Sequence, residues 1–290
     1  MDLWVLLVIV SIAVSVVFCI WKNHSFSLIT SVVCVFVYVV MRAGDSSNPY
    51  GIITDLGFAP RDVVEPSRFY TLLTSMYTHA SPSHLIFNLL ALALIGTMFE
   101  QRIGTRRYIL IYLITGICGA LAFSAIHWWS SAGVAVGASG AICGVLGGFA
   151  RKYGNDRMSL LFMPGVAAPV WVFAVLFVVL QILIVPINSN IAVESHLVGM
   201  LTGFLITPYV LRLQMEQPSA SRKVAPVAAL RKLATTPELR SELAKIEAET
   251  ISDVRNAWIE HFLSVSRCPQ CGAPVKVTRN SVQCERGHLL

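Results

Sequence analysis

Residues 138–149 read ASGAICGVLGGF, and this glycine-rich apolar stretch decides the fold. It ends just before the charged pair Arg151-Lys152, which leaves about 13 residues, or roughly 20 Å of helix. A bilayer has a hydrocarbon core about 30 Å thick. A helix that starts from the charged pair therefore stops about 10 Å short of the opposite surface, and Ser139 lies at that sunken end. Small residues here indicate either close helix packing or a reactive hydroxyl.

The composition is that of a polytopic membrane protein. Of 290 residues, 55% are hydrophobic and 13% are charged, which excludes an ordinary soluble enzyme. The net charge of +6 lies largely in loops and in the C-terminal tail, so it is not in itself a sign of nucleic-acid binding. Cysteines lie in apolar segments or in the tail, and they do not form the pattern of a secreted disulfide framework.

Seven apolar segments are expected to span or enter the membrane. Lys and Arg follow the first, third, fifth and seventh segments and are absent after the fourth and sixth. The positive-inside rule then predicts an N-terminus outside and a cytoplasmic C-terminus. The first segment is not expected to be a cleaved signal peptide, because Asp2 precedes it and Lys22 follows it. The segments are residues 3–20, 26–41, 82–99, 108–128, 138–150, 166–185 and 191–211.

Four polar residues are predicted to converge at one depth. The third, fifth and seventh segments all run inward from the outer face under this orientation. His84 and Asn88 lie in the first turns of the third segment, and Ser139 opens the fifth. His196 lies about five residues into the seventh, roughly 7–8 Å below its start. Ionisable residues inside a membrane are usually functional, so this coincidence favours chemistry over packing alone.

The residue types predict a nucleophile with a base. A serine becomes nucleophilic when a base accepts its proton, and histidine is the usual base, so Ser139 and His196 are expected to form a dyad. No acidic residue is placed to orient the imidazole, because Glu194 lies only two positions earlier and points away. His84 and Asn88 share one helix face at i, i+4, and with the Ser139 backbone N–H they are candidate donors to an oxyanion.

Glycines are expected to bring the two helices of the dyad together. Gly199 and Gly203 lie on one face of the seventh segment. Gly137 and Gly140 flank the serine on the fifth. Small residues at these positions let helix backbones approach closely in a membrane.

Taken together, these motifs resemble those of rhomboid intramembrane serine proteases. The resemblance covers roughly residues 25–212 and implies a six-helix core, here preceded by one extra N-terminal transmembrane helix within residues 1–24. It implies cleavage of membrane proteins with a single transmembrane segment near the outer side of the bilayer, through a Ser139–His196 dyad and without a catalytic cofactor. It also implies a structural pair, Glu100 and Arg102, at the inner end of the third segment. The matching motifs are His84-Leu-Ile-Phe-Asn88, Glu100-Gln-Arg102-Ile-Gly104, Gly137-Ala-Ser139-Gly140 and His196-Leu-Val-Gly199-Met-Leu-Thr-Gly203.

The chain departs from the family pattern at three places. Tyr70-Thr71 stands where rhomboids often carry Trp-Arg. Cys143 stands where an aromatic residue often stacks on the histidine, and Ser195 replaces a frequent alanine before His196. The alternative function is therefore a non-catalytic relative that binds transmembrane helices of partners. A transporter is disfavoured because no inverted repeat of broken helices is evident.

The tail after Arg212 changes in composition and is divided into three parts. Residues 213–236 are predicted to be a linker. Residues 237–266 carry apolar side chains at near-helical spacing, with a polar break at Thr250. This pattern predicts an amphipathic helix that packs on the module after it, on a partner helix or on the inner membrane surface, with the first favoured. Residues 267–290 form the third part.

That last part resembles a small zinc ribbon. Cys268, Cys271, Cys284 and His288 have the spacing of a closed four-ligand site, which is structural rather than catalytic. The residues between the two ligand pairs predict a β-hairpin with its turn near Asn280. Such ribbons bind protein or nucleic acid, and a cytoplasmic protein partner is favoured here. A zinc-ribbon tail on this kind of membrane core indicates the plasma membrane of an archaeon or another prokaryote. The basic residues available to a partner are Lys276, Arg279 and Arg286.

Overall fold

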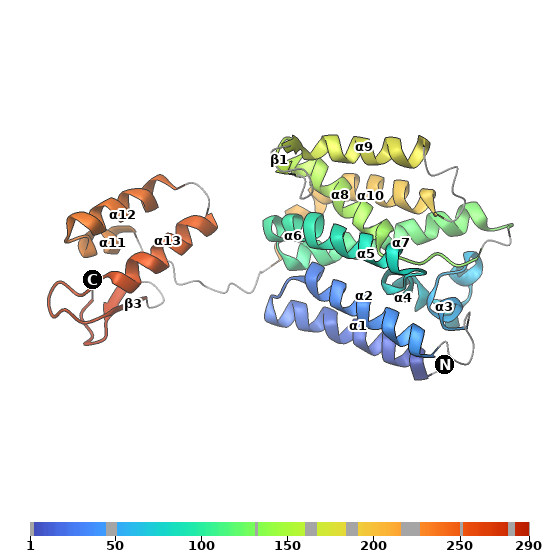
Figure 1. Cartoon of the computed structure of the whole chain (residues 1–290), viewed down its shortest axis with the longest axis horizontal. Coiled ribbons are helices and arrows are strands. Elements are labelled where there is room, and N and C mark those ends of the chain that lie inside the picture. The colour runs from blue at the N-terminus through green and yellow to red at the C-terminus, as the bar shows by residue number, and fades with distance from the viewer. Residues whose placement is uncertain are drawn as a thin grey trace. The chain divides into compact units, whose positions relative to one another are not determined.

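The computed structural model describes residues 3–44, 51–130, 133–159, 167–183, 191–215, 227–249, 252–277 and 282–289. The chain divides into two compact units, residues 1–217 and residues 218–290 (Figure 1). Each unit is described by itself below. The first contains the apolar helices and the second the cysteine-rich tail.

The membrane unit is a bundle of apolar helices, as the sequence predicts. Four of its described helices are long and apolar enough to cross a bilayer unaided: α1, α2, the continuous helix Pro82–Ile103, and α7. α8 has 15 residues, as expected for a helix that stops inside the membrane, and the described part of α9 has 14. The bounds are α1 Leu3–Lys22, α2 Phe26–Gly44, α7 Thr105–His127, α8 Ser139–Tyr153, α9 Val170–Leu183 and α10 Val193–Arg212.

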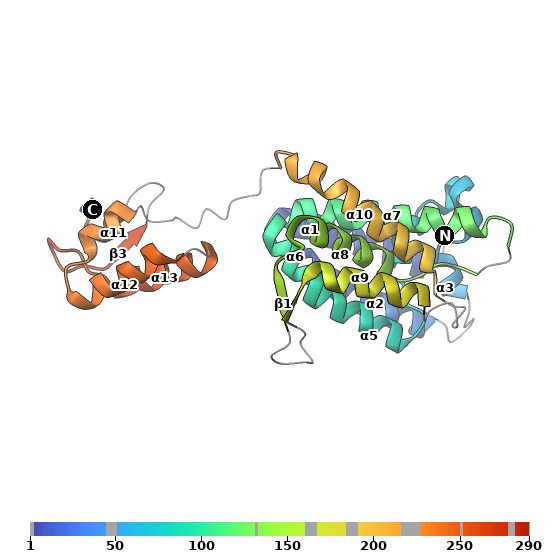
Figure 2. The same ribbon diagram turned by 90° about the horizontal axis from the view of Figure 1, so that it is seen from above.

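α8 lies at the centre of this unit, packed between α7 and α10 (Figures 1 and 2). Every residue from Ala141 to Phe149 is buried. α9 lies at one edge of the bundle, and α1 packs on α2 at the opposite edge. The helix that begins with the predicted nucleophile is therefore the most enclosed of the fold.

Glycines set the close approach of α8 and α10. A Cβ on Gly203 would collide with the carbonyl oxygen of Gly144, and a Cβ on Gly199 would collide with that of Gly140. On the other side of α8, a Cβ on Gly144 would strike the Thr115 side chain of α7. Backbone-to-backbone contact of this kind is possible only without side chains, which is why the seam consists of glycines.

The third predicted segment is one continuous helix with an irregular middle. α5 (Pro82–Ala91) leads into a π-helical stretch, η4 (Leu92–Gly96), and then into α6 (Thr97–Ile103). Ser81 caps the N-terminus by accepting a hydrogen bond from the His84 N–H at 3.2 Å. Gly96 closes the π stretch where a Cβ would come within 2.7 Å of the Tyr108 hydroxyl.

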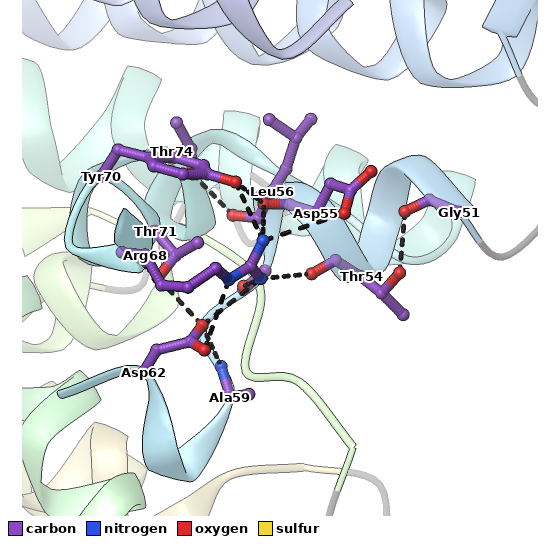
Figure 3. Close-up of polar contacts among 11 residues, drawn as sticks. Gly51, Thr54, Asp55, Leu56, Ala59, Asp62, Arg68, Tyr70, Thr71 and Thr74 are labelled. Atoms are coloured by element: carbon purple, nitrogen blue, oxygen red, sulfur yellow. Dashed lines mark hydrogen bonds and ion pairs between the residues drawn. The ribbon is translucent and has the colours of Figure 1, made fainter. Parts of the chain in front are cut away.

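Five short helices form the loop between α2 and α5, and one arginine holds them. Arg68 donates to the carbonyl oxygens of Thr54 (2.7 Å) and Asp55 (3.1 Å) and to the hydroxyl of Tyr70 (2.9 Å) (Figure 3). It also lies 3.4 Å from Asp62, which accepts hydrogen bonds from the Ala59 N–H and from Thr71. Arg68 thus fixes this loop from a position just before the Tyr70-Thr71 pair. The helices are α3 Gly51–Leu56, η1 Pro60–Val64, η2 Pro66–Arg68, α4 Thr71–Thr74 and η3 Ser75–Tyr77.

Glu100 and Arg102, the structural pair expected at the inner end of the third segment, contact different partners there. The buried Glu100 carboxylate accepts hydrogen bonds from the backbone N–H of Phe26 (2.6 Å) and Ser27 (2.9 Å), and Arg102 instead binds Asp156 at 2.7 Å. Residues 100 and 102 point in different directions because two positions on a helix are about 200° apart. Each therefore ties the inner end of this helix to a different neighbour.

The connections after the first, third, fifth and seventh predicted segments meet at one end of the bundle. Ser25, after α1, donates to Glu100 at 2.8 Å. Asp156, after α8, binds Arg102. The carbonyl oxygen of Leu213, after α10, accepts from Arg107 at 3.0 Å. The connections after the odd-numbered segments therefore lie at the same end of the bundle, as the distribution of basic residues predicts.

A short antiparallel ribbon follows α8. β1 (Arg157–Ser159) pairs with β2 (Ala167–Pro169), with Arg157 opposite Pro169 and Ser159 opposite Ala167. The sixth segment was expected to cover residues 166–185. The ribbon explains why α9 begins only at Val170.

The C-terminal unit has a core of its own, which corrects two boundaries. The expected linker 213–236 contains α11 (Val227–Leu233), whose Leu230 and Leu233 are fully buried with residues of the other helices. The expected single helix 237–266 is two helices, α12 (Pro237–Ala248) and α13 (Ser252–Val265). α13 packs against β3 (Val275–Val277), which pairs with β4 (Val282–Cys284), so the favoured packing of the amphipathic segment and the hairpin are both present. Arg279 and Asn280 lie outside the described residues.

Candidate active site and metal centre

Ser139 and His196 face each other across the α8–α10 seam. The Oγ atom of Ser139 lies 2.6 Å from Nε2 of His196. Ser139 is the first residue of α8, and His196 lies in the first turn of α10 and is 9% exposed. The glycine contacts one and two turns further along α10 hold the two backbones together. This distance is that of a short hydrogen bond between a hydroxyl and an imidazole.

The other side of His196 is held by α9. Nδ1 of His196 lies 3.1 Å from Oε1 of Gln181, and the ring of Phe177 lies 6.1 Å from the imidazole, tilted by 54°. Gln181 is buried. Neither Gln181 nor Phe177 was predicted from the sequence to belong to the site. Gln181 is nevertheless the only amide or charged side chain in residues 166–185, and this isolated polarity could have pointed to it.

His84 and Asn88 approach the serine from α5. Gly137, whose φ of +118° only glycine adopts easily, passes so close to His84 that a Cβ would lie 2.6 Å from the ring. That same Cβ position is 3.6 Å from Oγ of Ser139, so one glycine separates the imidazole and the hydroxyl. The Asn88 side chain donates to the His84 carbonyl oxygen at 2.8 Å, and its own Oδ1 has no partner among the described residues.

These side chains open onto one cavity of about 590 Å³. Ser139, His196, His84 and Asn88 all line it. The rest of its wall is mostly small and apolar, which leaves room for a peptide segment. The predicted donors and the predicted nucleophile therefore share one cavity. Small wall residues include Gly116, Ala120, Ala135, Ala141 and Ala192.

Residues just before His196 anchor the start of α10. Ser195 donates to the Gly119 carbonyl oxygen of α7 at 2.8 Å, so its hydroxyl ties α10 to α7. Glu194 lies 3.0 Å from Nε2 of His127, at the end of α7. Glu194 points away from His196, as its spacing predicts, and the partner of Nδ1 of His196 is Gln181. Cys143 is buried within α8, and the aromatic ring near the imidazole is that of Phe177 on α9.

Four side chains of the C-terminal unit form a cluster that could hold a metal ion. Their ligand atoms, from Cys268, Cys271, Cys284 and His288, lie within 4.8 Å of one another. Sγ of Cys271 and Cys284 are 3.7 Å apart, and Nδ1 of His288 lies 3.7 Å and 3.4 Å from Sγ of Cys268 and Cys284. A tetrahedral site with metal–sulfur bonds of about 2.3 Å has sulfur–sulfur edges of about 3.8 Å. The donor set and spacing therefore fit such an ion.

Backbone turns prepare this cluster for metal binding. Gly272 and Gly287 have φ of +69° and +87°, and their N–H groups donate to the carbonyl oxygens of Cys268 and Cys284. Burial opposes ionisation of the Cys268 thiol, but backbone N–H groups of Gln270 and Cys271 outweigh it and lower its pKa to about 6. A thiolate is the form that binds a metal.

Comparison with known proteins identifies the membrane unit. The sequence profile of the rhomboid domain matches residues 66–213, which include Ser139, His196, His84 and Asn88. The chain belongs to the rhomboid family. As a rhomboid with four apolar membrane-spanning helices, it is an integral membrane protein. The α1 helix and the C-terminal unit lie outside the matched residues.

Individual relatives match about half of the chain. The chain is 30% identical to "Rhomboid protease GluP" of Bacillus subtilis over 161 residues, which are 56% of this chain and 30% of the relative. It is 33% identical to "RHOMBOID-like protein 1" of Arabidopsis thaliana over 151 residues, 50% of this chain and 35% of that protein. "Putative rhomboid protease YdcA" of Bacillus subtilis is 29% identical over 50% of this chain and 68% of its own length. The chain thus spans about a third of the length of the first two.

Proposed function

We propose that this rhomboid is an intramembrane serine endopeptidase, in which Ser139 is the nucleophile and His196 the general base. The observation that carries the proposal is the 2.6 Å approach of Ser139 Oγ to His196 Nε2 in an enclosed cavity. A serine hydroxyl and an imidazole at this distance are the minimal machinery of acyl transfer. Family membership makes this chemistry the first expectation for the site.

Acylation begins when Ser139 Oγ attacks the scissile carbonyl carbon and its proton passes to Nε2 of His196. The carbonyl oxygen takes the negative charge of the tetrahedral intermediate. The Ser139 N–H at the start of α8, with the cavity-lining His84 and Asn88, would donate to this oxygen. The C–N bond then breaks, and His196 gives its proton to the leaving amine.

Deacylation repeats these steps with water. A water molecule attacks the acyl carbon of the Ser139 ester while His196 accepts its proton. The intermediate collapses, the Ser139 oxygen leaves and recovers the proton from His196, and the carboxylic acid product departs. The cavity provides room for both the peptide and this water.

The proposed substrates are membrane proteins with a single transmembrane segment, cut near the outer side of the bilayer. Ser139 lies at the end of the bundle opposite the connections that contain Arg102, Arg107 and Asp156. If these basic connections are cytoplasmic, as the positive-inside rule proposes, the site opens toward the outer half of the membrane. The membrane proposed is the plasma membrane of an archaeon or another prokaryote.

The test uses purified protein in detergent or liposomes, a tagged single-span reporter and a fluorophosphonate probe. Wild type should cleave the reporter and be labelled, and Ser139→Ala and His196→Gln should lose cleavage. Ser139→Ala should also lose labelling. Ser31→Ala, a serine on α2 that does not line the cavity, is the matched control and should keep both activities. A folded wild type that neither cleaves nor is labelled would favour the non-catalytic, helix-binding alternative.

We further propose that the C-terminal cluster binds zinc in a structural role. Three thiolates and one imidazole fill a closed tetrahedral site, which leaves no position for a substrate. The ion would stabilise the fold of residues 218–290. A cytoplasmic protein is the proposed partner of this unit, with the exposed Lys276 and Arg286 available to it.

A further inference from the structure

His196 is held between two helices, α8 and α9. No residue of α9 has a role in the proposed mechanism. Its Nε2 meets Ser139 of α8, and its Nδ1 meets Gln181 of α9. We propose that Gln181 is a positioning residue that fixes the tautomer and orientation of His196. The inference rests on the proposed function, since it assigns a third member to the Ser139–His196 pair.

The hydrogen-bond partners of His196 indicate which of its ring nitrogens carries the proton. To accept the Ser139 proton, Nε2 must hold a lone pair, so a neutral imidazole carries its hydrogen on Nδ1. The carbonyl oxygen of Gln181 lies 3.1 Å from Nδ1 and can only accept. Gln181 therefore stabilises the one neutral tautomer that can act as a base, and it also fixes the plane of the ring.

The surroundings of Gln181 indicate that a polar side chain is present at this position because it bonds to His196. Its side chain is 7% exposed on a helix that is otherwise apolar. A buried amide without a partner would cost roughly 1–3 kcal/mol. The hydrogen bond to His196 is the only one that the described residues give it. A glutamine kept solely for packing would be replaced at no loss by an apolar residue of the same length.

α9 supplies both the hydrogen-bond partner of Nδ1 and an aromatic ring near the imidazole. Phe177 precedes Gln181 by four residues, so both lie on one face of the helix. In the family pattern an aromatic residue four positions after the serine often stacks on the histidine, and here that position is Cys143. The support for His196 has thus moved from the helix of the nucleophile to its neighbour, α9.

Two substitutions of nearly equal length separate positioning from packing. Gln181→Met removes the acceptor, and kcat should fall by about 10- to 100-fold, part of what a positioned base supplies, with little change in KM. Gln181→Glu keeps an acceptor and should retain most of kcat. Its carboxylate stabilises the imidazolium, so the acid limb of the kcat/KM profile should move to higher pH by about one unit. Ile182→Ala, at the neighbouring position, is the control, because this residue is exposed on α9.

A second readout does not depend on proteolysis. With 15N-labelled histidine, the His196 ring signals are assigned by their loss in His196→Gln. In wild type Nδ1 should be protonated and Nε2 unprotonated, and Gln181→Met should give a mixture of tautomers. If wild type cleaves no reporter, the proposed function fails and the tautomer still decides the role of Gln181. The inference is overturned if Gln181→Met leaves both kcat and the tautomer unchanged, or if wild-type His196 is protonated at Nε2.

Discussion

Asn88 contributes the side-chain amide of the proposed oxyanion site. Its Nδ2 group donates to the carbonyl oxygen of His84 within its own helix, while Oδ1 has no partner among the described residues. The residue is 5% exposed and lines the cavity. A developing oxyanion in the cavity would be a stronger acceptor than the helix carbonyl, because it is charged.

Asn88→Ala should therefore weaken catalysis more than folding. Loss of one oxyanion donor costs about 100-fold or more in kcat, while KM for a reporter should change little. Cleavage kinetics and thermal unfolding measured side by side check this. A variant with wild-type kcat would remove Asn88 from the oxyanion site.

The site residues differ in how far sequence alone could predict them. Ser139, His196, His84 and Asn88 occur at spacings that fix their helix faces and depths, and the structure brings them to one cavity. Gln181 could not be paired with His196 in this way. Its contact depends on the rotation of α9 about its own axis, and a helix that is apolar on all sides does not specify that rotation.

At the level of elements, the seam between α8 and α10 sets the distance between nucleophile and base. Gly144 of α8 and Gly203 of α10 touch through their backbones, and Gly140 and Gly199 do so nearer to Ser139. Side-chain repacking cannot relieve a clash there, because the opposing atoms are backbone carbonyl groups.

Gly203→Ala should consequently lower both stability and activity. The added methyl group meets the Gly144 carbonyl and pushes the helices apart, at a cost of about 1–3 kcal/mol in unfolding free energy. Gly133→Ala is the control, since a Cβ there meets nothing within 4 Å. Thermal unfolding and reporter cleavage measure the two effects. Equal melting temperatures for both variants would contradict the tight seam.

The loop between α2 and α5 depends on the shape of the Arg68 guanidinium. Arg68→Lys keeps the charge but loses the planar donors that reach Thr54, Asp55 and Tyr70 together. We expect a loss of about 1–3 kcal/mol in stability. Arg61→Lys, at an exposed position of the same loop, should be nearly neutral. Thermal unfolding of the two variants distinguishes a specific network from a general need for charge.

Some element boundaries could not be read from sequence. Apolar length located the helices of the membrane unit, but the β1–β2 ribbon was missed because its strands have three residues each. α11 was missed because it is short and packs with residues distant in the chain. For Glu100 and Arg102 the sequence predicts a structural role at the inner end of the third segment but not their partners. Helix geometry directs the two side chains to different neighbours.

At the scale of the whole molecule, the two units have separate cores, so loss of the proposed zinc should affect only one of them. A strong chelator, or Cys271→Ser, should unfold residues 218–290 because so small a unit depends on its ion. Limited proteolysis should then release tail fragments while the membrane unit stays intact. Cleavage of the reporter should persist. Resistance of the tail to protease in a chelator, with no zinc found by elemental analysis, would contradict the structural site.

The π-helical stretch Leu92–Gly96 sets a constraint that concerns chain length rather than residue type. Asn88 and Glu100 are 12 positions apart, which in a regular α-helix leaves their directions about a third of a turn apart. The wider π turn changes this offset and so sets the direction of Glu100, which meets the start of α2, relative to that of Asn88, which lines the cavity. Deleting one residue here would rotate one half of the helix about 100° against the other. We therefore expect this apolar stretch to tolerate many substitutions but not the deletion of a single residue.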